Sequence, residues 1–287
     1  MLRQRRYRLS MRLWLLLPVV VLACAACGGT AKHAKLSEHA TQQAYVAGLG
    51  KHDEVATPLP SRAAVARHAR ACEGSRELAS ADGSSYAALV TRPIVVRSAP
   101  TRRSSVVDTL ETRNLHGFAQ VLGVVGVHRG SSCRADWYRV QLPVLPNRTT
   151  GWIRPWALKT FRGDTRIAVD LSERRLVAYR RDRVVMSVPV AVGAPGTPTP
   201  VGSFYVDERY IIPDASGPFG PNAIGISAHS DALKDVWVDD GPIGIHGTNE
   251  PGSIGLAASH GCIRVANASM RRLFDLAPAG TPVVVSA

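Results

Sequence analysis

The chain has 287 residues, 45% of them hydrophobic, which excludes a chain too polar to pack a core and allows two small domains. Its net charge of +13 would suit a nucleic-acid-binding protein. The charge is uneven, because residues 1–164 carry 24 Lys and Arg against 10 Asp and Glu, whereas residues 165–287 carry 11 against 12. The basic excess therefore belongs to the first part of the chain.

Residues 1–27 have the pattern of an export signal, with arginines near the start, a short apolar run over 13–23, and then small residues and cysteines. The segment 21–29 resembles a bacterial lipobox, in which either Cys24 or Cys27 would be lipidated. A plain cleaved signal and an uncleaved anchor are the alternatives. We expect an exported protein, lipid-anchored at the outer face of the cytoplasmic membrane or in the cell wall. Such a protein meets no nucleic acid, and its basic charge would favour anionic phospholipid and wall polymers.

Residues 28–84 are predicted to form a linker, because Ala, Lys, His, Ser and Gly dominate and Pro58 and Pro60 interrupt them. The four histidines in this segment are irregularly spaced and lack acidic or cysteine partners, so we expect no metal site. Cys72 and Cys133 remain outside the signal and the motif described below. A disulfide between them is permitted outside the membrane, and two unpaired thiols are the alternative.

Residues 85–162 are predicted to form a small β domain. Short β-type runs alternate with Pro, Gly, Ser or Asn turns, which is typical of a small barrel. These runs are 87–90, 94–97, 106–107, 121–127, 137–142 and 151–153. The segments 96–100, 137–140 and 151–153 resemble bacterial SH3-like domains, which often contact wall peptides or pack against a catalytic domain. We expect Trp137, Trp152 and Trp156 to lie in the core rather than to stack on a ligand.

Residues 163–287 begin with a predicted β-meander, and the fold as a whole is predicted to be mostly β with minor α. The meander covers 167–171, 175–179 and 184–192, and a loop rich in Gly and Pro at 193–202 leads into a strand at 203–207. Residues 211–240 show little periodicity and are predicted to be a long functional or mobile loop. A helix is predicted at 267–276, followed by a strand at 281–285.

Two segments, 243–248 and 259–264, supply what a cysteine nucleophile needs. His246 follows an apolar run that predicts a strand end, so its ring would be held on a rigid element. Gly247 and Gly261 allow close approach of the backbone to a substrate. Cys262 would sit on a tight turn, with its own amide and that of Gly261 facing an oxyanion.

His246 and Gly247, followed by Ser259, His260, Gly261 and Cys262, resemble the signature of the L,D-transpeptidase catalytic domain of the YkuD type. The resemblance covers about residues 165–285, under half of the chain. Arg264 stands where many members carry Asn, a departure that bears on substrate contacts more than on chemistry. The resemblance implies an SH3-like barrel followed by a catalytic β-sandwich, without a cofactor, and a flap formed by 211–240. We expect a monomer.

By resemblance, Cys262 attacks a carbonyl carbon of a peptidoglycan tetrapeptide stem, and His246, oriented by the carbonyl of Gly247, takes the thiol proton. Ser259 and His260 are expected to support the loop. Terminal D-alanine leaves, and an amine of a neighbouring stem completes a 3→3 cross-link. Water as the acceptor would give an L,D-carboxypeptidase, and a protein lysine would give a wall-anchoring enzyme. Another cysteine-dependent wall hydrolase and a non-catalytic envelope-binding lipoprotein also remain open.

Overall fold

The computed structural model describes residues 72–78, 85–235 and 240–287. The predicted signal, with Cys24 and Cys27, and most of the predicted linker lie outside these residues. Within the described part, no helix has the length and apolar character needed to cross a bilayer. The prediction of a mostly β fold is confirmed, since strands dominate and a single α-helix, α3 (Asn267–Leu276), is found among the described residues.

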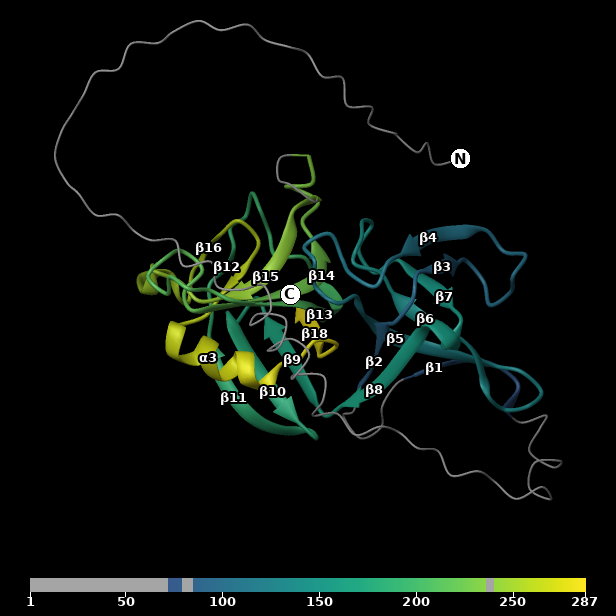
Figure 1. Cartoon of the computed structure of the whole chain (residues 1–287). Helices are drawn as coiled ribbons and strands as arrows, with labels where there is room; N and C mark the ends of the chain where they lie inside the picture. Colours follow the sequence, from purple (N-terminus) through teal and green to yellow (C-terminus); the bar gives the residue numbers. More distant parts are fainter. Residues whose placement is uncertain (1–71, 79–84, 236–239) are drawn as a thin grey trace, which may run out of the picture. The chain divides into compact units, whose positions relative to one another are not determined.

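The first eight strands form one sheet, with the order β4-β3-β7-β6-β5-β2-β8 and with β1 paired to β5 (Figure 1). A short 3-10 turn, η1 (Pro155–Ala157), separates β7 from β8. The strands are β1 (Gly74–Glu77), β2 (Ser85–Val90), β3 (Ile94–Arg97), β4 (Val106–Leu110), β5 (Val121–Arg129), β6 (Ala135–Gln141), β7 (Thr150–Ile153) and β8 (Leu158–Gly163). All six predicted runs of this region fall on strands, whereas β1 and β8 were missed.

Alternation explains the core of this sheet, because every second side chain of a strand faces the same side. Val96, Leu122, Val140 and Ile153 are fully buried in one cluster. Cys72 and Cys133 form a disulfide, with 5.4 Å between their Cα atoms. The bridge therefore fastens the segment before β1 to the turn between β5 and β6.

A second eight-stranded sheet has the order β11-β10-β9-β18-β13-β14-β15-β17, and β12 pairs with β16 beside it (Figure 1). A second 3-10 turn, η3 (Pro251–Ser253), lies between β15 and β16. The strands are β9 (Thr165–Asp170), β10 (Arg175–Arg180), β11 (Arg183–Pro189), β12 (Val192–Gly193), β13 (Gly202–Ile211), β14 (Asn222–His229), β15 (Pro242–His246), β16 (Ala257–Ser259), β17 (Ile263–Arg264) and β18 (Pro282–Ser286).

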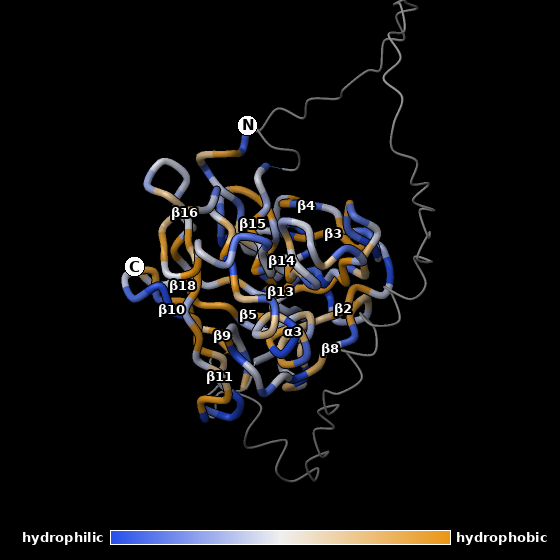
Figure 2. The backbone as a smooth tube through the Cα atoms, turned by 90° about the vertical axis from the view of Figure 1, so that its left-hand side faces the viewer, coloured by the Kyte–Doolittle hydropathy of each residue, from blue (hydrophilic) through white to orange (hydrophobic). Residues whose placement is uncertain are grey.

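Alternation of side chains along the strands also explains the core of the second sheet. The apolar face of α3 packs against this core. Met270, Leu273 and Phe274 are the buried residues of α3, at the spacing of one helical face. Figure 2 shows hydrophobic residues gathered on the strands, for example β9 and β11, and hydrophilic residues on the turns between them. The predicted bounds of this helix agree with the structure.

Two predictions about the second half were wrong. The expected long loop at 211–240 contains a strand, β14, which pairs with both β13 and β15. Its buried residues Ile224, Ile226 and Ala228 alternate with small ones, a pattern too short to stand out in the sequence. The expected strand at 184–192 is divided between β11 and β12.

Hydrogen bonds join β13 to the first sheet. Tyr205 donates from its hydroxyl to the carbonyl of Gln141 at 3.2 Å, and the Gln141 side chain donates to the carbonyl of Ser203 at 3.0 Å. Glu208 receives the side chains of Asn114, His116 and Tyr210, with His116 Nδ1 at 2.6 Å. The first sheet therefore fixes the strand next to β14, which in turn carries β15 and His246.

Candidate active site

His246 ends β15 and is 5% exposed. Its Nδ1 donates a hydrogen bond to the carbonyl oxygen of Gly247 at 2.5 Å. This bond places the ring proton on Nδ1 and leaves Nε2 as a proton acceptor. The ring of Phe219 meets the imidazole edge to face, with 4.9 Å between ring centres.

The electrostatics of the site keep His246 neutral. Burial is the main cause that lowers the pKa of His246 below its ordinary value of 6.5, and the positive charge of Arg264 lowers it further. The hydrogen bond to Gly247 acts in the opposite direction but does not prevail. A neutral imidazole with a bare Nε2 is the form that can accept a proton near pH 7.

Cys262 lies in the turn between β16 and β17, beside the strand that carries His246. β17 runs parallel to β15, pairing Ile263 with Ile245 and Arg264 with His246. Cys262 directly precedes β17, and its thiol interacts with the backbone of Gly244, two residues before His246 on β15. The pairing of β15 with β17 therefore brings the cysteine turn beside the end of the strand that carries His246.

Burial raises the pKa of the Cys262 thiol, and the backbone of Gly244 and the charge of Arg264 offset this only in part. Among the described residues, Cys262 is the single cysteine outside a disulfide. At neutral pH the resting site therefore holds a thiol beside a neutral imidazole. Nucleophilic attack by this sulfur would therefore require removal of the thiol proton.

Ser259 shapes the cysteine turn. Its hydroxyl donates to the carbonyl of Cys262 at 2.5 Å and accepts the amide of Gly261 at 3.1 Å. Gly261 has φ of +109°, a conformation suited to glycine. The amide of Gly261 is thus bonded to Ser259 in this structure, and the expectation that it faces an oxyanion stays a prediction.

The loop between β12 and β13 clamps the same turn from the other side. Thr199 donates from its hydroxyl to the carbonyl of Gly261 at 2.8 Å, and Thr197 donates to the carbonyl of Ser259 at 3.1 Å. Thr199 also accepts the amide of Gly193 at 2.9 Å. The sequence indicated a rigid Gly- and Pro-rich loop here, but these two threonines went unnoticed as supports of the cysteine.

Asn267 holds the histidine loop. Its Oδ1 accepts the amide of Thr248 at 2.8 Å, and the amide of Gly247 donates to the carbonyl of Asn222 at 3.2 Å. A Cβ added at Gly247 would lie 2.3 Å from Asn267 Oδ1 and 3.0 Å from the Cα of Gly220. Only glycine fits at position 247, so the carbonyl that orients His246 is fixed by packing on both sides.

Arg264 and Glu250 form an ion pair beside the cysteine turn. Arg264 Nη1 lies 2.5 Å from Glu250 Oε2, and the arginine side chain is largely buried whereas the glutamate is largely exposed. His260 is exposed on the turn. The structure therefore brings His246, Cys262 and Arg264 together, and it places His260 at the surface.

Among the described residues, no group of three His, Cys, Asp or Glu side chains is placed to hold a metal ion.

The second half of this chain is similar to known proteins. Residues 164–285 match the family model of the YkuD L,D-transpeptidase catalytic domain. A protein of Bacillus licheniformis named "Putative L,D-transpeptidase YkuD" is 41% identical over 121 residues, which are 42% of this chain and 65% of that protein. This chain thus covers less than two thirds of that relative. The "Putative L,D-transpeptidase YqjB" of Bacillus subtilis is 31% identical over 135 residues, covering 43% of this chain and 72% of that protein.

The NMR structure of the catalytic domain from an E. faecium L,D-transpeptidase is 27% identical, with a TM-score of 0.32, and the match covers 43% of this chain and 97% of that one. A buried histidine bonded to a carbonyl, near a cysteine on a tight turn, has the residue types that acyl transfer through a thiol requires. The chain belongs to the YkuD family of L,D-transpeptidases.

Proposed function

We propose that the protein is a peptidoglycan L,D-transpeptidase with Cys262 as its nucleophile and His246 as its general base. The observation that carries this proposal is the bond from His246 Nδ1 to the Gly247 carbonyl, at 2.5 Å, with Cys262 in the turn that leads into the adjoining strand. That bond turns Nε2 into the acceptor for the thiol proton. The names of the relatives in the family support the substrate class.

The reaction divides into two acyl transfers. Cys262 sulfur bonds to the carbonyl carbon of a tetrapeptide stem while its proton passes to His246 Nε2. The bond to the terminal D-alanine nitrogen then breaks, and His246 returns the proton to the leaving amine. In the second half, an amine of a neighbouring stem loses a proton to His246 and attacks the thioester carbon. The bond from that carbon to sulfur breaks, His246 returns the proton to the Cys262 sulfur, and a 3→3 cross-link results. Water in place of the amine gives L,D-carboxypeptidase activity, the second candidate.

The amide of Cys262 is proposed to stabilise the oxyanion of both steps. Loss of one such donor costs about 3–4 kcal/mol in the barrier in other enzymes. Ser259, Thr197 and Thr199 contribute indirectly, because they fix the turn on which that amide lies. The carbonyl of Gly247 is proposed as the orienting group, and Arg264 as a substrate contact through its position beside the turn.

We further propose that residues 85–162 form an SH3-like module and that the protein acts as a monomer outside the cytoplasmic membrane. The run of short strands from β2 to β8 supports the first point. The disulfide between Cys72 and Cys133 supports a location outside that membrane, because such bonds persist in oxidising compartments. Lipidation at Cys24 or Cys27 would hold the protein at the outer face of that membrane.

The activity is tested by incubation with a disaccharide-tetrapeptide, followed by mass analysis of the products. Release of D-alanine with formation of a dimer indicates transpeptidation, and release without a dimer indicates the carboxypeptidase. Cys262→Ala and His246→Ala should each abolish both products with the fold retained. The exposed neighbour provides the matched control, since His260→Ala should lower activity only as far as it lowers stability. More than a few per cent of activity in Cys262→Ala would refute the mechanism.

Location is tested separately by membrane fractionation. The native protein should stay on membranes in about molar salt, because acylation is covalent whereas surface attraction is screened. Replacement of both Cys24 and Cys27 by Ser should release it or leave it held only by an uncleaved signal. Release of the native protein by salt alone would replace the lipoprotein proposal by simple secretion.

A further inference from the structure

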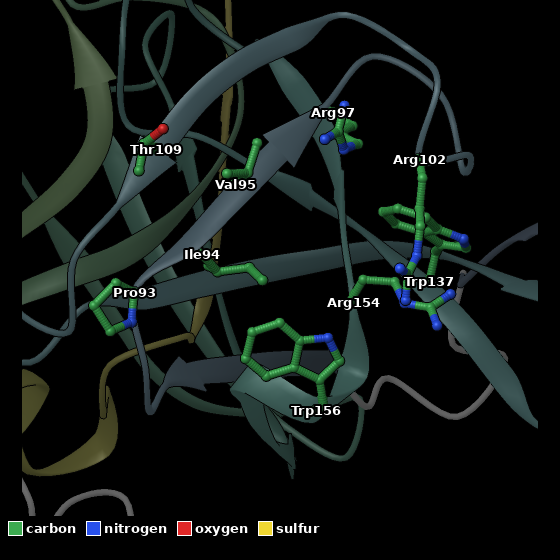
Figure 3. A pocket seen from close by; sticks show the side chains of 9 residues that line it. All are labelled: Pro93, Ile94, Val95, Arg97, Arg102, Thr109, Trp137, Arg154 and Trp156. Carbon is green, nitrogen blue, oxygen red and sulfur yellow. The ribbon is translucent and has the colours of Figure 1, made fainter.

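A groove of about 440 Å³ lies on the first sheet, and none of its lining residues belongs to the acyl-transfer site. Its walls come from β3, β4, β6 and the segment between β7 and β8 (Figure 3). The side chains that decide its chemistry are those of Arg97, Arg102, Arg154, Trp137 and Trp156, with Ile94 between them. The groove is therefore aromatic and cationic at once.

The two tryptophans play different parts. Trp137 is 4% exposed and belongs to the core, as the sequence predicted. Trp156 is 58% exposed, so the same prediction was wrong for it. It stands on η1, where the neighbouring Ala157 is fully buried and anchors the turn. A large indole held in solvent on an anchored turn, at the wall of a groove, is suited to contact with a ligand.

The charge of the groove has one sign. Three arginines and no Asp or Glu line it. The guanidinium carbon of Arg154 lies 5.0 Å from the centre of the Trp137 ring, and Arg154 Nε is buried with no hydrogen-bond partner among the described residues. Around the groove, residues 72–163 carry 13 Lys and Arg against 6 Asp and Glu. An anion would therefore be attracted both by the arginines of the groove and by the net positive charge of residues 72–163.

Hydrogen bonds within the loop between β3 and β4 hold the segment that carries Arg102. Arg97 donates to the carbonyl of Ser104 at 2.7 Å, and the hydroxyl of Ser104 donates to the carbonyls of Ala99 and Thr101, both at 2.9 Å. The loop is thus closed on itself between β3 and β4. Such preorganisation reduces the entropy lost when the arginine engages an anion.

We propose that this groove binds a polymer of sugar- or polyol-phosphate units. A sugar or polyol face would lie against Trp156, and a phosphate would be held by Arg97, Arg102 and Arg154. Planar guanidinium groups bind phosphate through paired hydrogen bonds. A polymer fits better than a single phosphate, because repeated charge can also meet the other basic residues of the first sheet.

Other occupants satisfy the observations less well. A proline-rich peptide would use the tryptophan but would leave three positive charges without counterions. An anionic lipid surface would meet the arginines, but it is flat, whereas Trp156 and the arginines line a groove. A single-stranded nucleic acid offers both phosphate and a stacking face, so it is the competitor that the experiment must separate.

The test is a binding titration of the full chain with poly(glycerol phosphate), beside neutral dextran, a single-stranded oligonucleotide and phosphatidylglycerol vesicles. We expect binding of the poly(glycerol phosphate) that is lost in about 0.5 M salt, and none of dextran. Trp156→Ala and the pair Arg97→Gln with Arg102→Gln should each weaken it by about ten-fold. The pair Arg183→Gln with Arg271→Gln removes the same charge from exposed sites of the second half and should change affinity by less than about two-fold.

The proposal is overturned by absent binding of poly(glycerol phosphate), by equal binding of dextran, or by equal weakening in the two arginine pairs. Tighter binding of the oligonucleotide or of the vesicles through the same residues would assign the groove to that partner instead. Release of D-alanine from a small soluble stem fragment should be unchanged in all of these variants. The proposal for the groove and the proposed acyl-transfer mechanism can therefore be refuted independently of each other.

Discussion

Asn267 begins α3, yet its side chain serves the histidine loop rather than the helix. Its Oδ1 accepts the Thr248 amide at 2.8 Å and packs where a Cβ at Gly247 would fall 2.3 Å away. Gly247 supplies the carbonyl that orients His246. Asn267→Ala should therefore free the peptide that fixes the tautomer and angle of the imidazole.

The size of the effect follows from burial. Thr248 is 4% exposed, so its amide would lose its partner with little access to water. An unsatisfied amide of this kind costs about 1–3 kcal/mol. If the loop instead relaxes so that the amide finds another partner, the carbonyl of Gly247 no longer orients His246. The activation free energy of the reaction should then rise by a comparable amount. Because about 1.4 kcal/mol corresponds to ten-fold in rate, kcat/KM should fall by about ten-fold.

The assay is release of D-alanine from the tetrapeptide fragment, with thermal unfolding measured in parallel. Asn267→Asp is the matched control, because it keeps an acceptor oxygen at the same position, and it should retain kcat/KM within about three-fold of the native protein. Full activity in Asn267→Ala would refute the link from helix to histidine. Equal losses in the Ala and Asp variants would show that the acceptor oxygen does not matter.

Two further substitutions test the electrostatics of the site and the close packing at Gly280. Arg264→Gln removes a positive charge that lowers the pKa of His246, so the acid limb of the kcat/KM profile should move to higher pH; an unmoved limb would contradict the electrostatic assignment. Gly280→Val should lower stability by about 2–4 kcal/mol in thermal or denaturant unfolding, because φ is +85° and a Cβ would lie 2.3 Å from that of Ala87. Gly196→Val, which meets no atom within 4 Å, should leave the midpoint nearly unchanged.

Local patterns predicted most of the strands and the helix. The spacing of Met270, Leu273 and Phe274 marks one helical face, and Pro278 with Gly280 stops it, so the bounds 267–276 needed no tertiary information. β14 escaped because its alternation rests on two isoleucines and an alanine among small polar residues. β17 escaped because two residues are too few to carry a period.

The residues of the candidate site also differ in whether the sequence alone could predict their contacts. Residues within one short motif, from Ser259 to Cys262, could be read together from the sequence, although the bond that occupies the Gly261 amide could not. Thr199 and Asn267 were missed because their partners are backbone groups, 62 and 19 positions away. Backbone acceptors and donors leave no trace in residue identity, so such contacts need the folded chain.

The resting protonation of Cys262 leads to a last prediction. Burial raises its pKa, and burial lowers that of His246, so near pH 7 the site holds a neutral thiol and a neutral imidazole. Alkylation by iodoacetamide requires the thiolate and no help from His246. Its rate, followed by mass spectrometry on the Cys262 peptide, should therefore climb steadily from pH 6 into the alkaline range.

Acyl transfer should behave differently, because in the proposed mechanism His246 accepts the thiol proton as sulfur attacks. Release of D-alanine should level off once His246 is neutral, at a pH where alkylation is still slow. His246→Ala should likewise depress acylation far more than alkylation. An alkylation rate already constant from pH 6 upward would show a resting thiolate–imidazolium pair. In that case the charge of Arg264 and the backbone of Gly244 would outweigh burial, and the proton would have moved before the substrate arrived.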